Sequence, residues 1–192
     1  CRNVRVNGAL VLSVAAGLSI DTLSRYLGGT RRIIRTMPNT PGKIGLGVSG
    51  MFAEAEVSEA DRTAADRIMR SVGLTVWLDE EDKLHNITGI SGSGPAYVFY
   101  LLGALQAAAQ AQGFSEEDAR TLSLATFKGA VALAEQSGED FAQLQQNVTS
   151  KGGTTHEAIE TFKSCHVAEA IAQGVEACVK RSQEMAKQYK VV

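Results

Sequence analysis

The sequence has few cysteines, no dominant charge and no long uninterrupted apolar run. Its three cysteines include no CxxC pair, which argues against a zinc site or a disulfide scaffold and favours a reducing compartment such as the cytoplasm. The formal net charge is −2 and the basic residues are scattered, so nothing favours nucleic acid as a partner. The longest apolar stretch, residues 96–109, is interrupted by Gln106 and is shorter than the roughly 20 residues of a membrane span. We therefore expect no membrane partner.

Motifs for metal binding and for nucleophilic catalysis are also missing. His85, His156 and His166 have neither HxxxH nor HExxH spacing, so each is expected at a helix end or on the surface. The string Gly89-Ile-Ser-Gly-Ser93 lacks the last glycine of the G-x-S-x-G nucleophile elbow. The two later cysteines fall in predicted helices, where packed thiols are the ordinary interpretation. The sequence predicts neither a metal site nor a hydrolase.

What is present is the composition of a globular protein. Hydrophobic residues make up 44% and charged residues 21% of 192 residues, enough to bury a real core. The first residues, Cys1-Arg-Asn-Val-Arg5, are not led by Met and resemble the middle of a protein. We therefore expect a fragment of a longer chain.

Strands and helices are predicted to alternate over the first 82 residues. Short apolar runs predict strands, and amphipathic segments between them predict helices: strands at 10–15, 32–36 and 74–78, and helices at 21–27 and 58–72. The first strand is almost wholly apolar, which is typical of a strand buried on both faces of a parallel sheet. The first two strands and their helix make a βαβ unit. Ligands of such sheets bind beyond the carboxyl ends of the strands, here residues 15–17 and 37–40.

One glycine-rich segment has the spacing of a nucleotide-binding loop. Gly45-Leu-Gly-Val-Ser-Gly50 matches the G-x-G-x-x-G dinucleotide pattern by spacing. That fingerprint requires a strand before it and a helix that opens on its last glycine. Here Pro41-Gly-Lys43 precedes the pattern, and residues 51–56 separate it from the next helix. We expect a glycine-rich strand, with a phosphate-binding loop as the alternative.

Nearly everything after Lys83 is predicted to be helical. The predicted helices lie at 84–88, 95–112, 115–137, 140–147, from 154 onwards, and 166–190. The helix at 95–112 is apolar on most sides at first, which predicts a central, buried position. Small residues, including Gly103, Gly129 and Gly174, let helices approach closely. An interlocked homodimer is the expected way to bury these faces, and a closed bundle of five helices is the alternative.

Two segments rich in glycine and hydroxyl groups are the candidate ligand sites. Residues 147–155 lead into Thr154-Thr155-His156-Glu157, a Ser/Thr-x-x-Glu pattern that predicts a capping box. A glycine loop before a helix offers free N–H groups to a small carboxylate, although an ordinary helix start remains the alternative. The second segment is Ser91-Gly-Ser-Gly-Pro95.

The polar side chains of both segments are expected to form one largely uncharged pocket. They are Thr88, Ser91, Ser93, Asn147, Thr149, Ser150, Thr154 and Thr155. Such a pocket has no strong base, so it leaves the difficult chemistry to a cofactor. Together with the βαβ unit, it points to hydride transfer.

Three segments resemble motifs of pyrroline-5-carboxylate reductase, the last enzyme of proline biosynthesis. They are Met37-Pro-Asn-Thr-Pro41, Thr88-Gly-Ile-Ser-Gly-Ser-Gly-Pro-Ala-Tyr97 and Val148-Thr-Ser-Lys-Gly-Gly-Thr-Thr155. The resemblance covers essentially the whole chain. It implies an α/β fold, in which the C-terminal part of a Rossmann-like NAD(P)-binding sheet, residues 1–82, precedes an all-helical dimerisation and substrate domain, residues 83–192.

The resemblance also implies an activity. It is that of an oxidoreductase that uses NADPH or NADH to reduce the C=N bond of 1-pyrroline-5-carboxylate to L-proline. The family implies a homodimer or an assembly of dimers, with the active site between its two domains. The family's first strand, its glycine-rich phosphate loop and the residue that chooses between NADPH and NADH are absent from these 192 residues. We therefore expect a truncated chain that is inactive alone.

The resemblance assigns residues to roles. Thr155 would hydrogen-bond the substrate ring and, with Thr88, make up the catalytic pair. The donors to the substrate carboxylate would be Ser150, Gly152, Gly153 and Thr154. The residues at the cofactor would be Met37, Asn39, Thr40 and Asn147, with Thr88 and Asn147 near both nicotinamide and substrate.

Two other functions remain open. The chain could be a non-catalytic helical assembly module. Another oxidoreductase, similar to 6-phosphogluconate dehydrogenase, would need a catalytic base in the helical part, where Lys151 is the nearby candidate.

Overall fold

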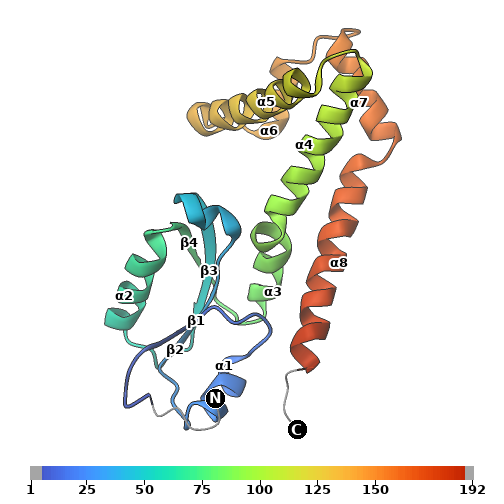
Figure 1. Ribbon diagram of the computed structural model, residues 1–192. Coiled ribbons are helices and arrows are strands. Elements are labelled where there is room, and N and C mark those ends of the chain that lie inside the picture. The colour runs from blue at the N-terminus through green and yellow to red at the C-terminus, as the bar shows by residue number, and fades with distance from the viewer. Residues whose placement is uncertain (1–5, 189–192) are drawn as a thin grey trace. The chain divides into compact units, whose positions relative to one another are not determined.

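The computed structural model describes residues 6–188 and divides the chain into two compact units (Figure 1). The sheet unit comprises residues 1–95 and 174–192, and the helical unit comprises residues 96–173. Strands give way to helices near the predicted domain boundary at residue 82. The packing units divide elsewhere because the first turns after residue 82 and the end of the last helix belong with the sheet. The domain assignment itself stays a prediction.

The sheet has four strands in sequence order: β1 (Val11–Ser13), β2 (Ile33–Met37), β3 (Gly47–Ala53) and β4 (Gly73–Trp77). The β1/β2 and β3/β4 pairs are parallel, and β2/β3 is antiparallel. All the predicted strands form. The expectation that the first strand is buried on both faces is wrong, because β1 lies at an edge of the described sheet and its residues are only half-buried.

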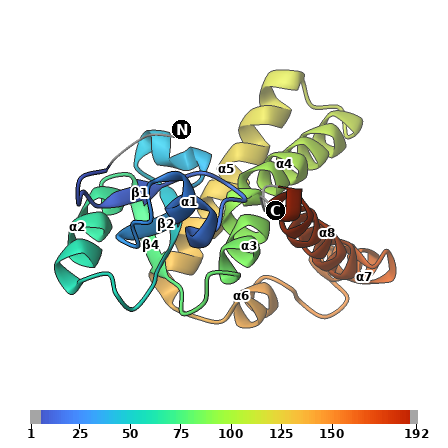
Figure 2. The same cartoon turned by 90° about the horizontal axis from the view of Figure 1, so that it is seen from below.

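Helices cover both faces of the sheet. On one face α1 (Ile20–Tyr26) buries Ile20 and Leu23 against Ile33. On the other, α2 (Glu59–Arg70) packs Ala65 and Met69 against Ile34, and Figures 1 and 2 both show it beside the sheet. Adjacent isoleucines of β2 thus serve opposite faces, as strand geometry requires.

The predicted helix starts in this unit are confirmed. Ser19 and Ser58 are the N-caps of α1 and α2, and each hydroxyl accepts a backbone N–H three residues on, from Thr22 and Asp61. Ile68 of α2 is apolar but exposed, so it does not belong to the inward face of the helix. The buried positions repeat every fourth residue through Asp61, and Arg32 makes an ion pair with that carboxylate.

The glycine-rich segment forms a strand, as expected, rather than a phosphate loop. A 3₁₀ turn, η1 (Thr40–Ile44), ends at Gly45, and β3 follows directly. A Cβ on Gly50 would lie 2.7 Å from Cγ2 of Ile87. The glycine is therefore needed for close packing of the next helix on the sheet.

The remaining elements are helical. They are α3 (Lys83–Ile87), a π-helical turn η2 (Thr88–Gly92), α4 (Gly94–Ala111), α5 (Glu116–Ser137), α6 (Phe141–Asn147), α7 (Thr154–Ser164) and α8 (Val167–Gln188). The predicted end of the last helix at Lys190 lies outside the described residues. Within the sheet unit η2 packs closely on α8, since a Cβ on Gly89 would lie 2.6 Å from Cγ2 of Val179.

The expectation that α4 is central and buried is wrong for the single chain. None of its residues is buried, and Phe99 and Tyr100 are 68% and 78% exposed. In the described part of the helical unit only Ala119 and Ser123 are buried. The unit therefore has almost no core of its own, because its apolar faces stay uncovered by the rest of residues 6–188.

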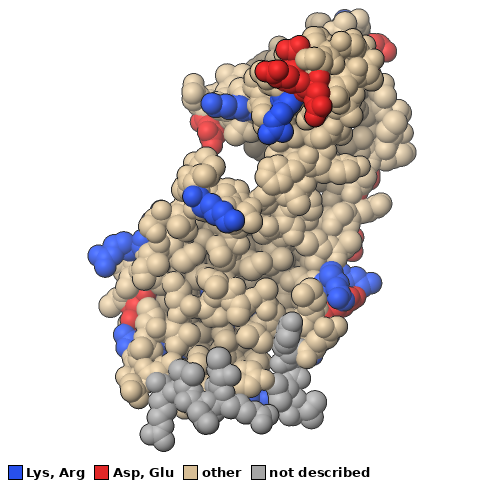
Figure 3. Space-filling view, in the orientation of Figure 1, with Lys and Arg blue, Asp and Glu red and all other residues tan. Residues whose placement is uncertain are grey.

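The surface is mostly uncharged on the face drawn in Figure 3, where basic and acidic side chains lie in small separate groups. No helix in residues 6–188 is long and apolar enough to cross a membrane.

Candidate functional site

The carboxyl ends of β1 and β2 lie together because the two strands are parallel neighbours. Residues 15–17 follow β1, and Met37–Asn39 end and follow β2. Thr88 of η2 and Ser182 of α8 complete this edge, and Met37 and Thr88 line the same hollow. An adjoining cavity of about 290 Å³ is lined by Gly17, Thr88, Ser93, Cys178, Ser182 and neighbouring residues.

The loop after β2 is tied to η2 through Asn39. Its Nδ2 donates to the carbonyl oxygen of Ser91 at 2.9 Å, and its Oδ1 accepts the N–H of Val48 at 2.8 Å. Thr40 opens η1 and is exposed. Of the cofactor residues that the resemblance assigns, Met37 and Asn39 therefore lie near Thr88 at this edge, and Thr40 is the first residue of η1.

The hydroxyl groups of η2 are oriented by their own helix. Thr88 Oγ1 donates to the carbonyl of Leu84 at 2.7 Å, and Ser91 Oγ donates to that of Ile87 at 3.3 Å. A hydroxyl that has donated its proton presents its oxygen lone pairs as an acceptor. Thr88 is therefore set up to accept a hydrogen bond from a ligand.

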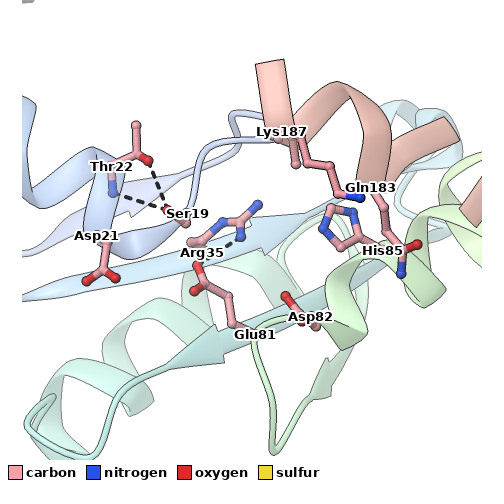
Figure 4. Close-up of a pocket in the computed structure, with 11 residues that line it drawn as sticks. Ser19, Asp21, Thr22, Arg35, Glu81, Asp82, His85, Gln183 and Lys187 are labelled. Atoms are coloured by element: carbon pink, nitrogen blue, oxygen red, sulfur yellow. Dashed lines mark hydrogen bonds and ion pairs between the residues drawn. The ribbon is translucent and has the colours of Figure 1, made fainter. Parts of the chain in front are cut away.

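A second hollow of about 420 Å³ lies on the same edge and is polar (Figure 4). Arg35 of β2 is buried and donates from Nη1 to Oε1 of Glu81 at 2.9 Å. His85 of α3 lies within hydrogen-bond distance of Ser182 of α8, with 2.8 Å between Nδ1 and Oγ. Burial, and then the nearby positive charge of Arg35, lower the pKa of His85 below its usual value.

The start of α1 looks at first like a phosphate site, because a glycine turn leads from β1 into a helix. Two of its N–H donors are already used: that of Ile20 donates to Glu81 at 2.7 Å, and that of Thr22 donates to Ser19. The Glu81 carboxylate would also repel a phosphate placed there. The turn from β1 into α1 is therefore a poor site for a phosphate.

The segment at 147–155 belongs to the helical unit. The predicted capping box is wrong: α7 has Gly153 as its N-cap with no side-chain hydrogen bond, and Thr154 is already helical. The reason is that Gly153 takes the extended conformation that the cap position requires, and its carbonyl accepts the N–H of Glu157. The N–H groups in the first turn of α7 are consequently left without a side-chain cap.

The residues before α7 hold the loop in shape. Gly152 has a φ of 70°, which favours glycine, and a Cβ on Gly153 would lie 2.3 Å from Ser150 Oγ, so a larger residue there would displace the serine side chain. Asn147 donates from Nδ2 to Glu139 at 2.9 Å, and its Oδ1 accepts from Gln143 at 2.8 Å. Thr155 lies in the first turn of α7 and is half-buried.

The structure thus groups the expected site residues into two sets. Met37, Asn39 and Thr88 lie together in the sheet unit, while the segment from Asn147 to Thr155 is folded around one helix start in the helical unit. The sequence interpretation missed Arg35, Glu81 and Ser182. The one signal for them was a charged residue, Arg35, inside an apolar strand that leads into Met37–Pro41.

The chain is similar in sequence to known proteins. A family model described as pyrroline-5-carboxylate reductase dimerisation matches residues 81–185. The chain is 41% identical over 179 residues to a pyrroline-5-carboxylate reductase of Vibrio alginolyticus, covering 93% of this chain and 66% of that protein. It is 40% identical to one of Haemophilus influenzae, covering 92% and 65%. The chain therefore spans about 65% of the length of these curated relatives.

Solved structures give the same result. A pyrroline-5-carboxylate reductase from Coxiella burnetii is similar with a TM-score of 0.86 and 39% identity, over 91% of this chain and 65% of that one. A pyrroline carboxylate reductase from Plasmodium falciparum, solved with NADP bound, has a TM-score of 0.86 and 30% identity, over 94% and 72%. At this coverage the likeness includes both the sheet and the helices.

Proposed function

Because the chain belongs to the pyrroline-5-carboxylate reductase family, we propose that it is part of an enzyme that reduces 1-pyrroline-5-carboxylate to L-proline with NADPH or NADH. Its fold is α/β, a Rossmann-like sheet followed by a helical dimerisation domain. The observation that carries the proposal is 41% identity over 93% of the chain to a protein of that name. The arrangement of polar groups at both parts of the site supports it.

The substrate carboxylate is assigned to the start of α7. The N–H groups of Thr154 and Thr155 have no side-chain acceptor there, and the positive end of the helix dipole favours an anion. Ser150, Gly152 and Gly153 shape the loop so that these donors face one place. Lys151 is exposed, and the described residues give it no hydrogen-bond or ion-pair partner, so it adds no buried base.

The ring nitrogen is assigned to a threonine hydroxyl, and each unit offers one candidate. Thr88 has its proton donated to Leu84, so its oxygen can accept from the N–H of a protonated imine. Thr155, which lies half-buried in the first turn of α7, is the neutral candidate in the helical unit. A fixed cation at this place would oppose protonation of the imine, and neutral hydroxyls avoid that cost.

When bound, the cofactor would supply the hydride that adds to the C=N carbon of the protonated imine, and the ring nitrogen becomes the amine of proline. Met37, Thr40 and Asn147 would lie at its nicotinamide end. The chain's own contribution is placement, and orientation of two reactants can account for roughly 7–11 kcal/mol of a reaction barrier. The groups that would hold the pyrophosphate are assigned to the part of the relatives that this chain does not match.

Assembly as a homodimer, or a set of dimers, follows from the exposed apolar helices. Phe99 and Tyr100 of α4 and Phe141 of α6 are exposed in a unit that has almost no buried residues. Large exposed apolar faces of this kind mark interfaces. A cytoplasmic location is proposed with the enzyme, because two free cysteines among the described residues fit a reducing compartment.

The test is NAD(P)H oxidation by the full-length protein with 1-pyrroline-5-carboxylate as substrate. We expect oxidation only when both substrate and enzyme are present, with proline as the product identified by mass spectrometry. No oxidation with either nucleotide, by a folded full-length protein, would refute the proposal and leave the non-catalytic helical assembly module as the alternative.

A further inference from the structure

Asn39 uses both ends of its side-chain amide within the fold. Nδ2 donates to Ser91 and Oδ1 accepts from Val48, at 2.9 and 2.8 Å. The Ser91 bond joins residues 52 positions apart in the sequence. One side chain therefore connects the loop after β2, the start of β3 and the turn η2.

Each partner of Asn39 lacks an ordinary backbone partner. In a helix the carbonyl of Ser91 would accept the N–H four residues on, but that residue is Pro95, which has no N–H. The β2/β3 ladder stops at the pair Met37 and Gly50. Continuing its register by two residues places Asn39 opposite Val48, whose N–H then finds the side-chain oxygen instead of a strand.

We propose that Asn39 is a positioning residue for the reductase reaction rather than a direct ligand of the cofactor. Its amide holds the Met37 loop against the turn that carries Thr88, and so sets the spacing between the two walls of the hollow that both residues line. The inference rests on the proposed function for its effect on catalysis. The hydrogen bonds themselves do not depend on that function.

Only an amide of this length satisfies both partners. A carboxylate at this position could still accept the N–H of Val48, but it could not donate to the carbonyl of Ser91 and would repel it. Protonation of that carboxyl group restores one O–H donor. Asn39→Asp should therefore be a variant whose defect is repaired by acid.

The test uses the full-length protein with Asn39→Asp, Asn39→Ala and the control Asn86→Asp. Asn86 is exposed on α3 and makes no hydrogen bond in the described structure, so its change introduces the same charge without breaking a contact. We expect kcat of Asn39→Asp to fall about 100-fold at neutral pH, the cost typical of a misplaced reactant. The Kd for NADPH, measured by fluorescence, should stay within about twofold, as for a group that touches no cofactor.

The pH profile gives the second readout. Relative to wild type, kcat of Asn39→Asp should recover as the pH falls through the carboxyl pKa, while Asn39→Ala should show no recovery and Asn86→Asp no defect. A Kd for NADPH that rises with unchanged kcat would overturn the proposal, because Asn39 would then be a ligand. A defect of Asn39→Asp that does not change with pH would also overturn it.

Amide hydrogen exchange separates this inference from the proposed function, since it needs no activity. Asn39→Ala should speed exchange at Val48, whereas Asn39→Asp should leave it protected because its carboxylate still accepts that N–H. Equal protection of Val48 in Asn39→Ala and wild type would overturn the inference even in an active reductase. If the wild type shows no reductase activity, the exchange result still decides the role of Asn39.

Discussion

Removing the carboxylate of Glu81 should destabilise the sheet unit more than any other single change at this edge. Glu81 accepts from Arg35 and from the backbone N–H of Ile20 with the same oxygen, so it joins β2 to the start of α1. The two partners are unequally buried: the Arg35 side chain is 9% exposed and that of Glu81 is 28% exposed. The cost of breaking the pair should therefore depend on which partner is removed.

The expected loss in the free energy of unfolding depends on which charged group each substitution leaves without its partner. Glu81→Ala leaves the Arg35 cation buried without a counter-charge, which costs about 3–5 kcal/mol of the free energy of unfolding. Arg35→Met leaves a partly hydrated carboxylate that still accepts from Ile20, so we expect about 1–2 kcal/mol. The double variant Arg35→Met/Glu81→Ala should be more stable than Glu81→Ala alone, because no charge then stays buried.

The assay is urea unfolding of the 192-residue chain, followed by fluorescence. Trp77 of β4 is its only tryptophan, so the signal reports on the sheet. Glu80→Ala is the matched control: Glu80 is exposed and its side chain makes no hydrogen bond or ion pair in the described structure, so its removal should change stability by less than about 0.5 kcal/mol. A loss below about 1 kcal/mol in Glu81→Ala, or an equal loss in Arg35→Met, would refute this account of the pair.

Thr155→Ala in the full-length protein should remove a hydrogen bond to the substrate worth about 1–3 kcal/mol, and so lower kcat/KM, while NADPH affinity stays near normal. Thr161→Ala on the same helix should have no effect, and an unchanged kcat/KM in Thr155→Ala would contradict the assignment. Light scattering at micromolar concentration should give a dimer or a larger assembly, and a monomer would disprove the interface at residues 95–190. The 192-residue chain alone should bind NADPH at least about 100-fold more weakly than the full-length enzyme, and should not turn over, because its described residues hold no glycine-rich phosphate loop. Low-micromolar binding by nucleotide fluorescence would show that another loop holds the phosphates. The pKa of His85 is lowered from 6.5 by burial and then by Arg35. Its stabilising contribution should therefore be present above that pH and be lost as the pH falls through the folded-state pKa. His85→Gln should flatten this loss in urea unfolding measured across pH, and an unchanged slope would contradict it.

Local features of the sequence determined where the elements begin and end. Ser58 and Ser115 were predicted to start helices, and both cap one. The glycine-rich segment was correctly predicted as a strand, because the fingerprint it resembles requires a helix that the next residues cannot form. Caps, breakers and periodicity act over a few residues, so they are visible without a fold.

Two local predictions failed, each for a different reason. Thr154 matched a capping box, yet the extended backbone of Gly153 took the cap position. The helix at 95–112 was expected in a core because of its apolar residues, but sequence pattern cannot say whether the covering partner is in the same chain. Phe99 and Tyr100 stay exposed among the described residues.

The candidate site was only half determined by the sequence. The polar residues of both glycine-rich segments could be predicted as ligand groups, since their chemistry is visible in the sequence. The antiparallel direction of β3, the link from Arg35 to Glu81 and the bonds of Asn39 to Ser91 and Val48 were decided by the tertiary structure alone. Each depends on groups that are distant in sequence and meet only once the sheet has formed. The hydrogen-bond partner of such a side chain depends on packing and on which backbone groups lack another donor or acceptor. A short-range sequence pattern contains no information about either.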